Sequence, residues 1–366
     1  MPQDSSYDQL MSGVAWEEFC DNLKMAGQIV MADKAPDDPL TRAEGFRYLS
    51  RLTRAALEAF VEYSDPLAPV LFRPVHETAK MGADNPDFYY QWAAIDGKHE
   101  YCIRGNRGSI HYLGFGTYAG QYGAGGRSGK TGYLEGRDLE IKPDGSFEIR
   151  LSCCKQEGNW LPMEEDTSSL IVRQMYLDRE KEKPADLRIE RVDGGKSSVQ
   201  LSPEKVAEGL GQAGRLVAGA SAIFSGWAED FKKHVNQLPE FDQKTSLAAH
   251  GDPNICYYHS YWRLNEGEAL LVEAEPPECD YWNFQLSNHW MESLDYRYNR
   301  ISINKHTARY RDDGSVRIVV AHEDPGSDNW LTTDGHRFGT MCFRWVRARE
   351  HPRPRTRVVE LSAFET

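Results

Sequence analysis

Hydrophobic residues recur at every third or fourth position in two stretches of the chain, the spacing of an amphipathic helix. The first stretch follows Asp38-Pro39, a helix-capping carboxylate and a proline suited to the first helical turn. Its apolar positions are Phe46, Leu49, Leu52, Ala56, Phe60 and Tyr63. This pattern predicts one clear helix, and a weaker helix is expected before it, from about Tyr7 to Ala32.

The second stretch begins at Ser202-Pro203 and is closed by Pro239. Its apolar positions are Val206, Leu210, Ala213, Val217, Ala220, Phe224, Trp227, Phe231 and Val235. Five glycines interrupt it, at 209, 211, 214, 219 and 226. Each costs about 1 kcal/mol relative to alanine inside a helix. We therefore expect a kink or a break into two helices.

The rest of the chain is typical of β-structure. From Tyr89, and again after Tyr257, short runs of aromatic and β-branched residues alternate with glycine-bearing turns. The segment 139–151 carries alternating residues on both sides of Asp144-Gly145, a pair suited to a tight turn, and is predicted to be a hairpin.

The second β region repeats the first, 169 to 171 positions later. The matched segments are Asp144-Gly-Ser146 with Asp313-Gly-Ser315, Asn159-Trp-Leu161 with Asn329-Trp-Leu331, and Arg173 with Arg344. Turns with Asp-Gly are common in hairpins, but the Asn-Trp-Leu triplet and the arginine are not generic hairpin residues. Two copies are too few for a solenoid or a propeller.

We therefore predict an α+β, mainly antiparallel fold with two repeated β-sandwich or jelly-roll-like domains, joined and capped by helices. The expected boundaries are a helical region over 1–80, a first β domain over 84–200, a helical linker or lid over 201–245, and a second β domain over 250–366.

Several of these motifs resemble a known family. The segments are Tyr298-Asn-Arg-Ile-Ser-Ile303, Asp313-Gly-Ser-Val-Arg-Ile318, Asp328-Asn-Trp-Leu331 and Phe343-Arg-Trp345. Together they resemble domain of unknown function 1214, and Glu157-Gly-Asn-Trp-Leu-Pro162 resembles the same signature in the first copy. Asn85-Pro-Asp-Phe-Tyr-Tyr90 is similar to an element of the companion domain of unknown function 1254. The resemblance covers about 84–178 and 257–348 and implies antiparallel β-sandwich domains without an established reaction.

The composition of the chain limits the kinds of partner that it is expected to bind. The 366 residues carry a net charge of -13, which opposes attraction to nucleic acid or to an anionic membrane surface. No run approaches the 18 apolar residues of a membrane span, and the N-terminal residues do not form a signal pattern. Seven cysteines without Cys-x-x-Cys spacing argue against a disulfide framework or a local zinc site. A cytoplasmic location is expected.

Familiar cofactor motifs are missing from the sequence. It contains no phosphate-binding loop, no Gly-x-Ser-x-Gly elbow and no His-Glu-x-x-His helix. The glycine-rich stretch 120–132 lies in a β context and is expected to be a loop or lid. A metal site would need the fold to assemble distant histidines, at 111, 250, 259 and 289, so we predict no metal and no cofactor.

The richest candidate site spans Cys279 to Asp295. On a strand, Trp282, Phe284 and Leu286 face one way, and the polar residues between them face the other way. We expect Trp282, Asn288 and Trp290 to bind a small molecule, because aromatic surfaces with a few polar groups are typical of such pockets. The alternative is that both tryptophans are core anchors.

Proton transfer is predicted for Glu292, Asp295, His322 and Asp324. A histidine titrates near neutral pH, and His322 and Asp324 follow a predicted strand that ends at Ala321. Cys153 replaces His322 in the first copy, so the repeated fold does not need the imidazole.

Four further residues are candidates for ligand contact. Tyr90, Trp92 and Arg104, on the first β stretch, are expected to form an opposite wall of a shared cleft. Arg344 is a candidate for binding a substrate anion. For Arg173 and Arg344 together, however, a structural ion pair repeated in both copies is the favoured interpretation, because a buried arginine needs a partner.

These residues suggest two functions. The leading hypothesis is a cofactor-independent acid–base enzyme, a hydrolase or a lyase or isomerase, acting on a small, partly apolar or polyhydroxylated molecule. The alternative is a noncatalytic carbohydrate- or lipid-binding or assembly protein, with a helix stripe that packs against another subunit of a homo-oligomer.

Overall fold

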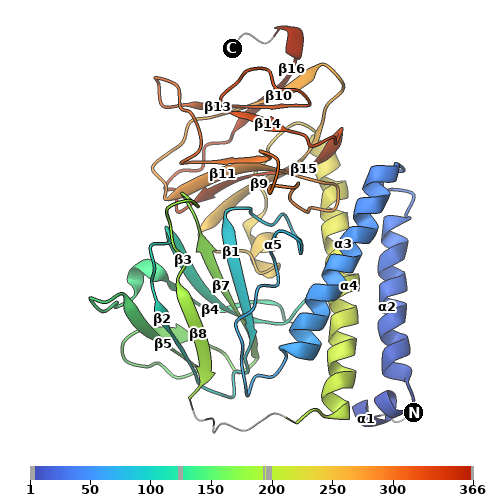
Figure 1. Cartoon of the computed structure of the whole chain (residues 1–366), viewed down its shortest axis with the longest axis vertical. Helices are drawn as coiled ribbons and strands as arrows, with labels where there is room; N and C mark the ends of the chain where they lie inside the picture. Colours follow the sequence, from blue (N-terminus) through green and yellow to red (C-terminus); the bar gives the residue numbers. More distant parts are fainter. Residues whose placement is uncertain (1–4, 123–126, 193, 195–199, 364–366) are drawn as a thin grey trace.

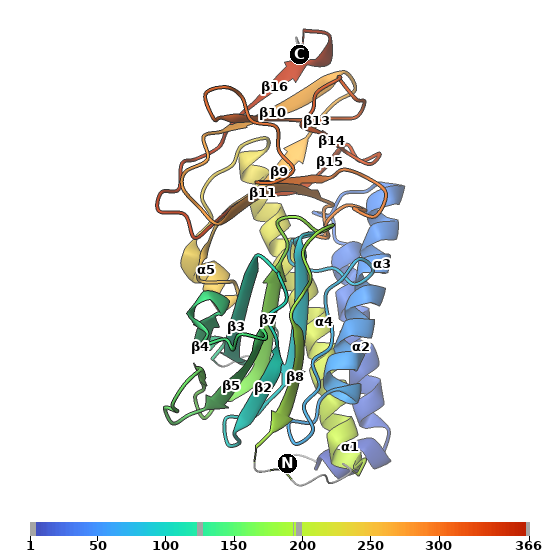
Figure 2. The ribbon, with the colours of Figure 1, turned by 60° about the vertical axis from the view of Figure 1, so that its left-hand side comes forward.

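The computed structural model describes residues 5–122, 127–192, 194 and 200–363. Two β-sandwiches follow each other along the long axis, and helices cover one flank (Figures 1 and 2). The flanking helices are α1 (Ser6–Met11), α2 (Val14–Val30), α3 (Pro39–Leu57) and α4 (Pro203–Phe231). A short helix, α5 (Gln243–Ala248), precedes the second sandwich. Among the described residues, no helix is long and apolar enough to cross a membrane.

Local sequence explains where these helices begin. The Asp38 carboxylate accepts a hydrogen bond from the backbone N–H of Thr41, 2.9 Å away, and Pro39 occupies the first turn of α3. The predicted helix from Tyr7 to Ala32 is wrong in one respect, since it is two helices. Gly13 adopts φ 84° between α1 and α2, a conformation that residues with a side chain rarely adopt.

Helix α4 corrects the expected break, because it runs without interruption for 29 residues. A Cβ on Gly209 would lie 2.3 Å from the carbonyl oxygen of Phe60, and one on Gly214 would lie 3.0 Å from the Cβ of Asn22. These glycines let α4 pack closely against the N-terminal helices. The packing outweighs the propensity cost that predicted a break.

The structure confirms the repeat strand for strand. The first copy contains β1 (Phe88–Ala94), β2 (Tyr101–Asn106), β3 (Tyr112–Ala119), β4 (Gly129–Glu135), β5 (Ser146–Ser152), β6 (Trp160–Pro162), β7 (Thr167–Met175) and β8 (Asp186–Arg191). The second contains β9 (Ile255–Arg263), β10 (Glu268–Ala274), β11 (Tyr281–Ser287), β12 (Ser302–Asn304), β13 (Val316–Ala321), β14 (Trp330–Thr332), β15 (Phe338–Val346) and β16 (Arg355–Glu360).

Each copy folds into two four-stranded sheets with matching strand order. The first copy has β1-β7-β3-β4 and β6-β5-β2-β8, and the second has β9-β15-β11-β12 and β14-β13-β10-β16. Only the pairs β5–β6 and β13–β14 are parallel among the described strands. The sheets that contain β1 and β9 face the helices, and the β10 sheet forms the far end of the molecule (Figure 1).

The repeated Asn-Trp-Leu triplet has a structural role. The Asn159 amide donates to the carbonyl oxygens of Glu140 and Glu148, each 2.9 Å away, and Asn329 makes the same two bonds to Arg309 and Arg317. The amide oxygen also accepts a backbone N–H in each copy, from Glu140 in the first and from Arg309 in the second, and in the first copy this bond holds the segment before the Asp144-Gly145 turn. That segment is not a strand, so the predicted hairpin over 139–151 is wrong in its first arm.

Candidate functional site

A cavity of about 750 Å³ lies where the helices meet both sandwiches. Its walls come from β1 and β7 of the first copy, β9 and β15 of the second, α3 and α4, and the loops around 81–85, 120–122 and 246–251. The two copies therefore line one shared cavity. The predicted glycine-rich loop contributes Gly120 and contains residues 123–126, which lie outside the described part of the chain.

The first copy presents a row of alternate residues to this cavity. Phe88, Tyr90 and Trp92 of β1 all line it, because alternate side chains of a strand share a face. In the antiparallel pairing of β1 with β7, Arg173 lies directly opposite Tyr90.

The second copy presents the equivalent row. Ile255, Tyr257 and His259 of β9 line the cavity, and Arg344 of β15 lies directly opposite Tyr257. A tyrosine–arginine pair therefore occupies the same position of each repeat, and both pairs lie in the wall of one cavity.

Both arginines are buried, with exposed fractions of 7% for Arg173 and 3% for Arg344. Arg173 donates to the Tyr118 hydroxyl, 2.7 Å away, and to the backbone carbonyl of His250. Among the described residues, no carboxylate lies within ion-pair distance of either guanidinium. The favoured interpretation, a structural ion pair at Arg173 and at Arg344, is therefore wrong for the residues that the structure describes.

Arg344 is held by amides and a carbonyl. It donates to Gln285 Oε1 at 2.6 Å, to Asn283 Oδ1 at 3.3 Å, and to the backbone carbonyl of Ala83. A guanidinium has five N–H donors, so both arginines keep donors that these bonds do not use.

Carboxylates near the arginines are occupied elsewhere. Asp84 accepts from the backbone N–H of Ser293 at 2.9 Å and from its hydroxyl at 2.8 Å. Asp252 accepts from the hydroxyls of Tyr112 and Tyr133, 2.9 and 3.0 Å away. The two carboxylates balance part of the positive charge of the arginines from beyond contact distance. They accept no hydrogen bond from the unused guanidinium N–H groups.

The two phenols of the pairs are protonated. Burial raises the pKa of Tyr90 to about 12 and also raises that of Tyr257, although Arg344 and Arg173 both act to lower these values. Both guanidinium charges thus act on both phenols. Tyr90 accepts a hydrogen bond from the backbone N–H of Asn85, whereas no described residue bonds the Tyr257 hydroxyl.

Two histidines border the cavity in the neutral form. Burial, followed by the charge of Arg173, lowers the pKa of His250 to about 4, and its Nε2 lies 3.1 Å from the Ser128 hydroxyl. Burial, followed by Arg344, lowers the pKa of His259 to about 3. Within the described ranges, no group of three or more His, Cys, Asp or Glu residues could hold a metal ion.

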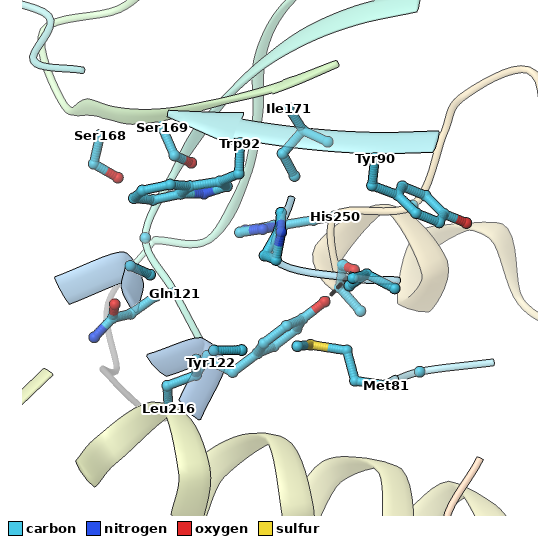
Figure 3. Close-up of a pocket in the computed structure, with 18 of the residues that line it drawn as sticks. Met81, Tyr90, Trp92, Gln121, Tyr122, Ser168, Ser169, Ile171, Leu216 and His250 are labelled. Carbon is cyan, nitrogen blue, oxygen red and sulfur yellow. Dashed lines mark hydrogen bonds between the residues drawn. The ribbon is translucent and has the colours of Figure 1, made fainter. Parts of the chain in front are cut away.

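The remaining wall is largely aromatic and aliphatic. Trp92 and Tyr122 lie on opposite sides of the cavity with His250 between them, and Met81 and Leu216 lie on the side of Tyr122 (Figure 3). The Tyr122 hydroxyl donates to the carbonyl of Ala249 at 2.8 Å, which turns its ring face toward His250. An apolar ligand body would find aromatic surfaces here.

Three of the predicted contact residues, Tyr90, Trp92 and Arg344, line the cavity. Arg104 does not. It lies on β2, partly exposed, and pairs with Glu148 at 2.6 Å and with Glu190. Arg104 does lie on the first β stretch as predicted, but no local pattern indicates that β2 belongs to the other sheet of the sandwich.

The candidate site residues between Trp282 and Glu292 lie outside the cavity. They pack in the core of the second sandwich or connect this segment to α3. Trp282 stacks on Phe343 in the core of the second sandwich. The indole N–H of Trp290 donates to the Thr41 carbonyl at 2.8 Å, which ties this segment to α3. Glu292 forms an ion pair with Arg51 of α3 at 2.5 Å and accepts from Asn288 at 3.0 Å.

The other three residues predicted for proton transfer also lie away from the cavity. His322 Nδ1 is 2.7 Å from the Thr333 hydroxyl, Asp324 accepts from the backbone N–H of Gly326 at 2.8 Å, and Asp295 pairs with Arg297 at 2.6 Å. The fold does not bring these groups together with Glu292 at one site.

Sequence reasoning missed Tyr257 and did not single out His259 as a ligand contact. The signal was present, because Ile255, Tyr257 and His259 alternate as Phe88, Tyr90 and Trp92 do. Aligning the two copies upstream of the repeated motifs would have matched these rows.

The fold and the site together define a class: a two-copy β-sandwich protein flanked by helices, with a cavity that both copies line. Residues 266–349 match the family described as "Protein of unknown function (DUF1214)". An uncharacterized protein from Burkholderia cenocepacia is 52% identical over 98% of this chain and 100% of its own, with a TM-score of 0.96. The chain belongs to the same family as that protein.

A more distant structure shares the fold alone. The VPA0106 protein from Vibrio parahaemolyticus is 12% identical over 93% of this chain and 100% of its own, with a TM-score of 0.50. No curated protein matches this chain.

Proposed function

We propose that this protein binds a small organic anion with an apolar body in the shared cavity. The observation that carries the proposal is that Arg173 and Arg344, two buried cations at equivalent repeat positions, both line the cavity, and no carboxylate of the described residues contacts either of them. A buried charge is costly unless it is paired. A ligand carboxylate would supply the missing partner, and its two oxygens suit a guanidinium fork.

The cavity suits such a ligand in size and surface. Its volume of about 750 Å³ falls within the range of small-molecule sites. Trp92, Tyr122 and Phe224 offer aromatic surface for the apolar body. An uncharged carbohydrate would leave both guanidinium groups unpaired, whereas an organic acid, including a fatty acid, would satisfy them.

Acid–base turnover of the bound anion is a second candidate function, favoured by the Tyr257 hydroxyl. This group has no partner among the described residues and lies on the strand position opposite Arg344. Because burial raises its pKa, it would act as a proton donor to the ligand rather than as a base.

The proposal also includes a family assignment for one segment of the chain and a cellular location. We infer that Asn85 to Tyr90 is the element of domain of unknown function 1254 and that the protein works in the cytoplasm. In support of the first, Asp87 accepts from the Tyr281 hydroxyl at 2.6 Å, so the element joins the first copy to β11.

The test is ligand binding by the purified full-length protein, measured by calorimetry. The probes are benzoate and decanoate with their neutral amides, benzamide and decanamide. We expect the acids to bind at least tenfold tighter than the amides, and Arg344→Met to abolish this difference. Arg344→Lys should retain part of it, and Arg104→Met is the control expected to change nothing. Equal binding of acids and amides by the wild type would refute the proposal.

A further inference from the structure

The two rows that line the cavity, Phe88, Tyr90 and Trp92 in β1 and Ile255, Tyr257 and His259 in β9, share only the tyrosine. Both contain the tyrosine opposite an arginine, but two residues further along the strand β1 has Trp92 and β9 has His259. The residues opposite them also differ, Ile171 in the first copy and Cys342 in the second. At this level the first copy contributes an indole and an aliphatic side chain, and the second copy contributes an imidazole and a thiol.

His259 is tightly held, with an exposed fraction of 6%. Its ring stacks between Phe231, at 5.3 Å and 4°, and Tyr257, at 5.5 Å and 9°. Its Nε2 lies 3.8 Å from the thiol sulfur of Cys342. Its Nδ1 is buried without a hydrogen-bond partner among the described residues.

A buried polar atom without a partner is costly, by about 1–3 kcal/mol, and is rare in native structures. An apolar residue would fill this stacked position without the cost. His259 lines the cavity, and the hydrogen-bonding capacity of its Nδ1 is not used by any described residue.

We propose that His259 hydrogen-bonds a second polar group of the ligand, beside the anion held by Arg344 and Tyr257. Two residues along a strand span about 7 Å, which sets the separation between the two ligand groups. The ligand class is an organic acid that carries a hydroxyl, oxo or amide group about that far from its carboxylate, with its apolar surface on the Trp92 side. This inference rests on the proposed anion binding and adds to it the residue that sets specificity.

The test uses matched acids that differ by one hydroxyl: benzoate with 4-hydroxybenzoate, and hexanoate with 6-hydroxyhexanoate. Calorimetry on the wild-type protein should show at least one hydroxy acid binding about tenfold tighter than its parent. His259→Phe keeps a stacked ring without ring nitrogens and should remove this preference, while the parent acid binds within about twofold of wild type. Trp92→Phe is the matched control in the first copy and should weaken both acids of a pair equally.

The outcomes separate this inference from the proposed function. Parent acids that bind through Arg344, with no hydroxyl preference or with a preference that survives in His259→Phe, would overturn the role of His259 alone. Failure of every acid to bind would overturn the proposed function instead.

A second measurement needs no variant. ¹⁵N NMR of the wild-type imidazole should show the Nδ1 resonance of His259 shift when the preferred hydroxy acid is added, but not when its parent acid is added. An unchanged Nδ1 resonance with the hydroxy acid bound would refute the contact even if the Phe variant failed to fold.

Discussion

The two copies hold the same cation in different ways. In the second copy, Arg344 is anchored by Asn283 and Gln285 of the neighbouring strand β11. In the first copy the equivalent positions of β3 are Gly114 and Gly116. A Cβ at either glycine would lie 2.6 Å from a tyrosine hydroxyl, of Tyr133 or Tyr118, so rings occupy the space of the amides.

This difference indicates what the site requires. The side chains that hold the guanidinium differ between the copies, two amides for Arg344 and a phenol for Arg173, with a backbone carbonyl accepting in each, yet the arginine and its partner tyrosine are present in both. A structural role would tie the arginine to its supports. A shared role toward the cavity accounts for the common cation and for the freedom of its surroundings.

The largest expected effect is the loss of unfolding free energy when either arginine is replaced. It compares the groups that hold Arg344 with the groups that hold Arg173. Arg344→Met should lower the free energy of unfolding by about 3 kcal/mol, because it leaves the buried acceptors of Asn283 and Ala83 without donors and leaves Gln285 Oε1 only the 3.3 Å bond from the Asn283 amide. Arg173→Met leaves only the Tyr118 hydroxyl and one carbonyl, and should cost about 1–2 kcal/mol.

Urea unfolding of the two variants beside the wild type measures both values. An equal loss in the two variants, or a greater loss for Arg173→Met, would show that the amide support of the second copy adds nothing.

The next effect is a pH dependence of the unfolding free energy that His259 causes in the second copy. Burial lowers the pKa of His259 from 6.5 to about 3, so the unfolded state takes up a proton below pH 6.5 that the folded state does not. Stability should therefore fall as the pH drops from 6.5 toward 4, by about 1.4 kcal/mol per pH unit for this histidine. Trp92, which occupies the equivalent position in the first copy, has no side-chain group that takes up a proton in this pH range.

His259→Phe should therefore reduce the slope of unfolding free energy against pH between 6.5 and 4, measured by urea unfolding at several pH values. His250→Phe provides an independent comparison, since the pKa of His250 is lowered to about 4. A slope unchanged by His259→Phe would contradict the buried, neutral imidazole.

Sequence predicted those parts of the fold that depend on local patterns. Asn159 and Asn329 revealed the repeat because each bonds backbone within about 20 residues, and the alternation along β11 correctly separated the core face of Trp282 from the polar face of Asn283. The unbroken α4 was missed, because its glycines contact Phe60 and Asn22, far away in the chain.

The site was less predictable for the same reason. Tyr90, Trp92 and Arg344 were found because aromatic and cationic residues on strands are conspicuous. Glu292 looked equally suitable for chemistry, but its partner Arg51 lies 241 positions away, on a helix whose placement no local pattern predicts. Arg173 was not singled out for ligand binding, because only the assembled fold reveals that no carboxylate of the described residues contacts its guanidinium.

The smallest effect concerns a buried contact of the second copy with α3. His336 Nε2 lies 3.1 Å from Glu44 Oε2, and both residues are buried. Burial acts to lower the pKa of His336, but the hydrogen bond and the charge of Glu44 outweigh it, and the net shift is upward. The contact should therefore stabilise the fold fully below pH 6.5 and lose this contribution as the pH rises through the raised value.

The difference in unfolding free energy between the wild type and His336→Gln isolates this contact from the other histidines. We expect about 1 kcal/mol at pH 6 and a smaller difference at pH 8.5. Glu44→Gln, alone and combined with His336→Gln, completes a double-mutant cycle whose coupling energy should follow the same pH trend. A coupling that grows with pH would mean that the neutral imidazole makes the contact, and the second copy would then have no pH-dependent tie to α3 through this pair.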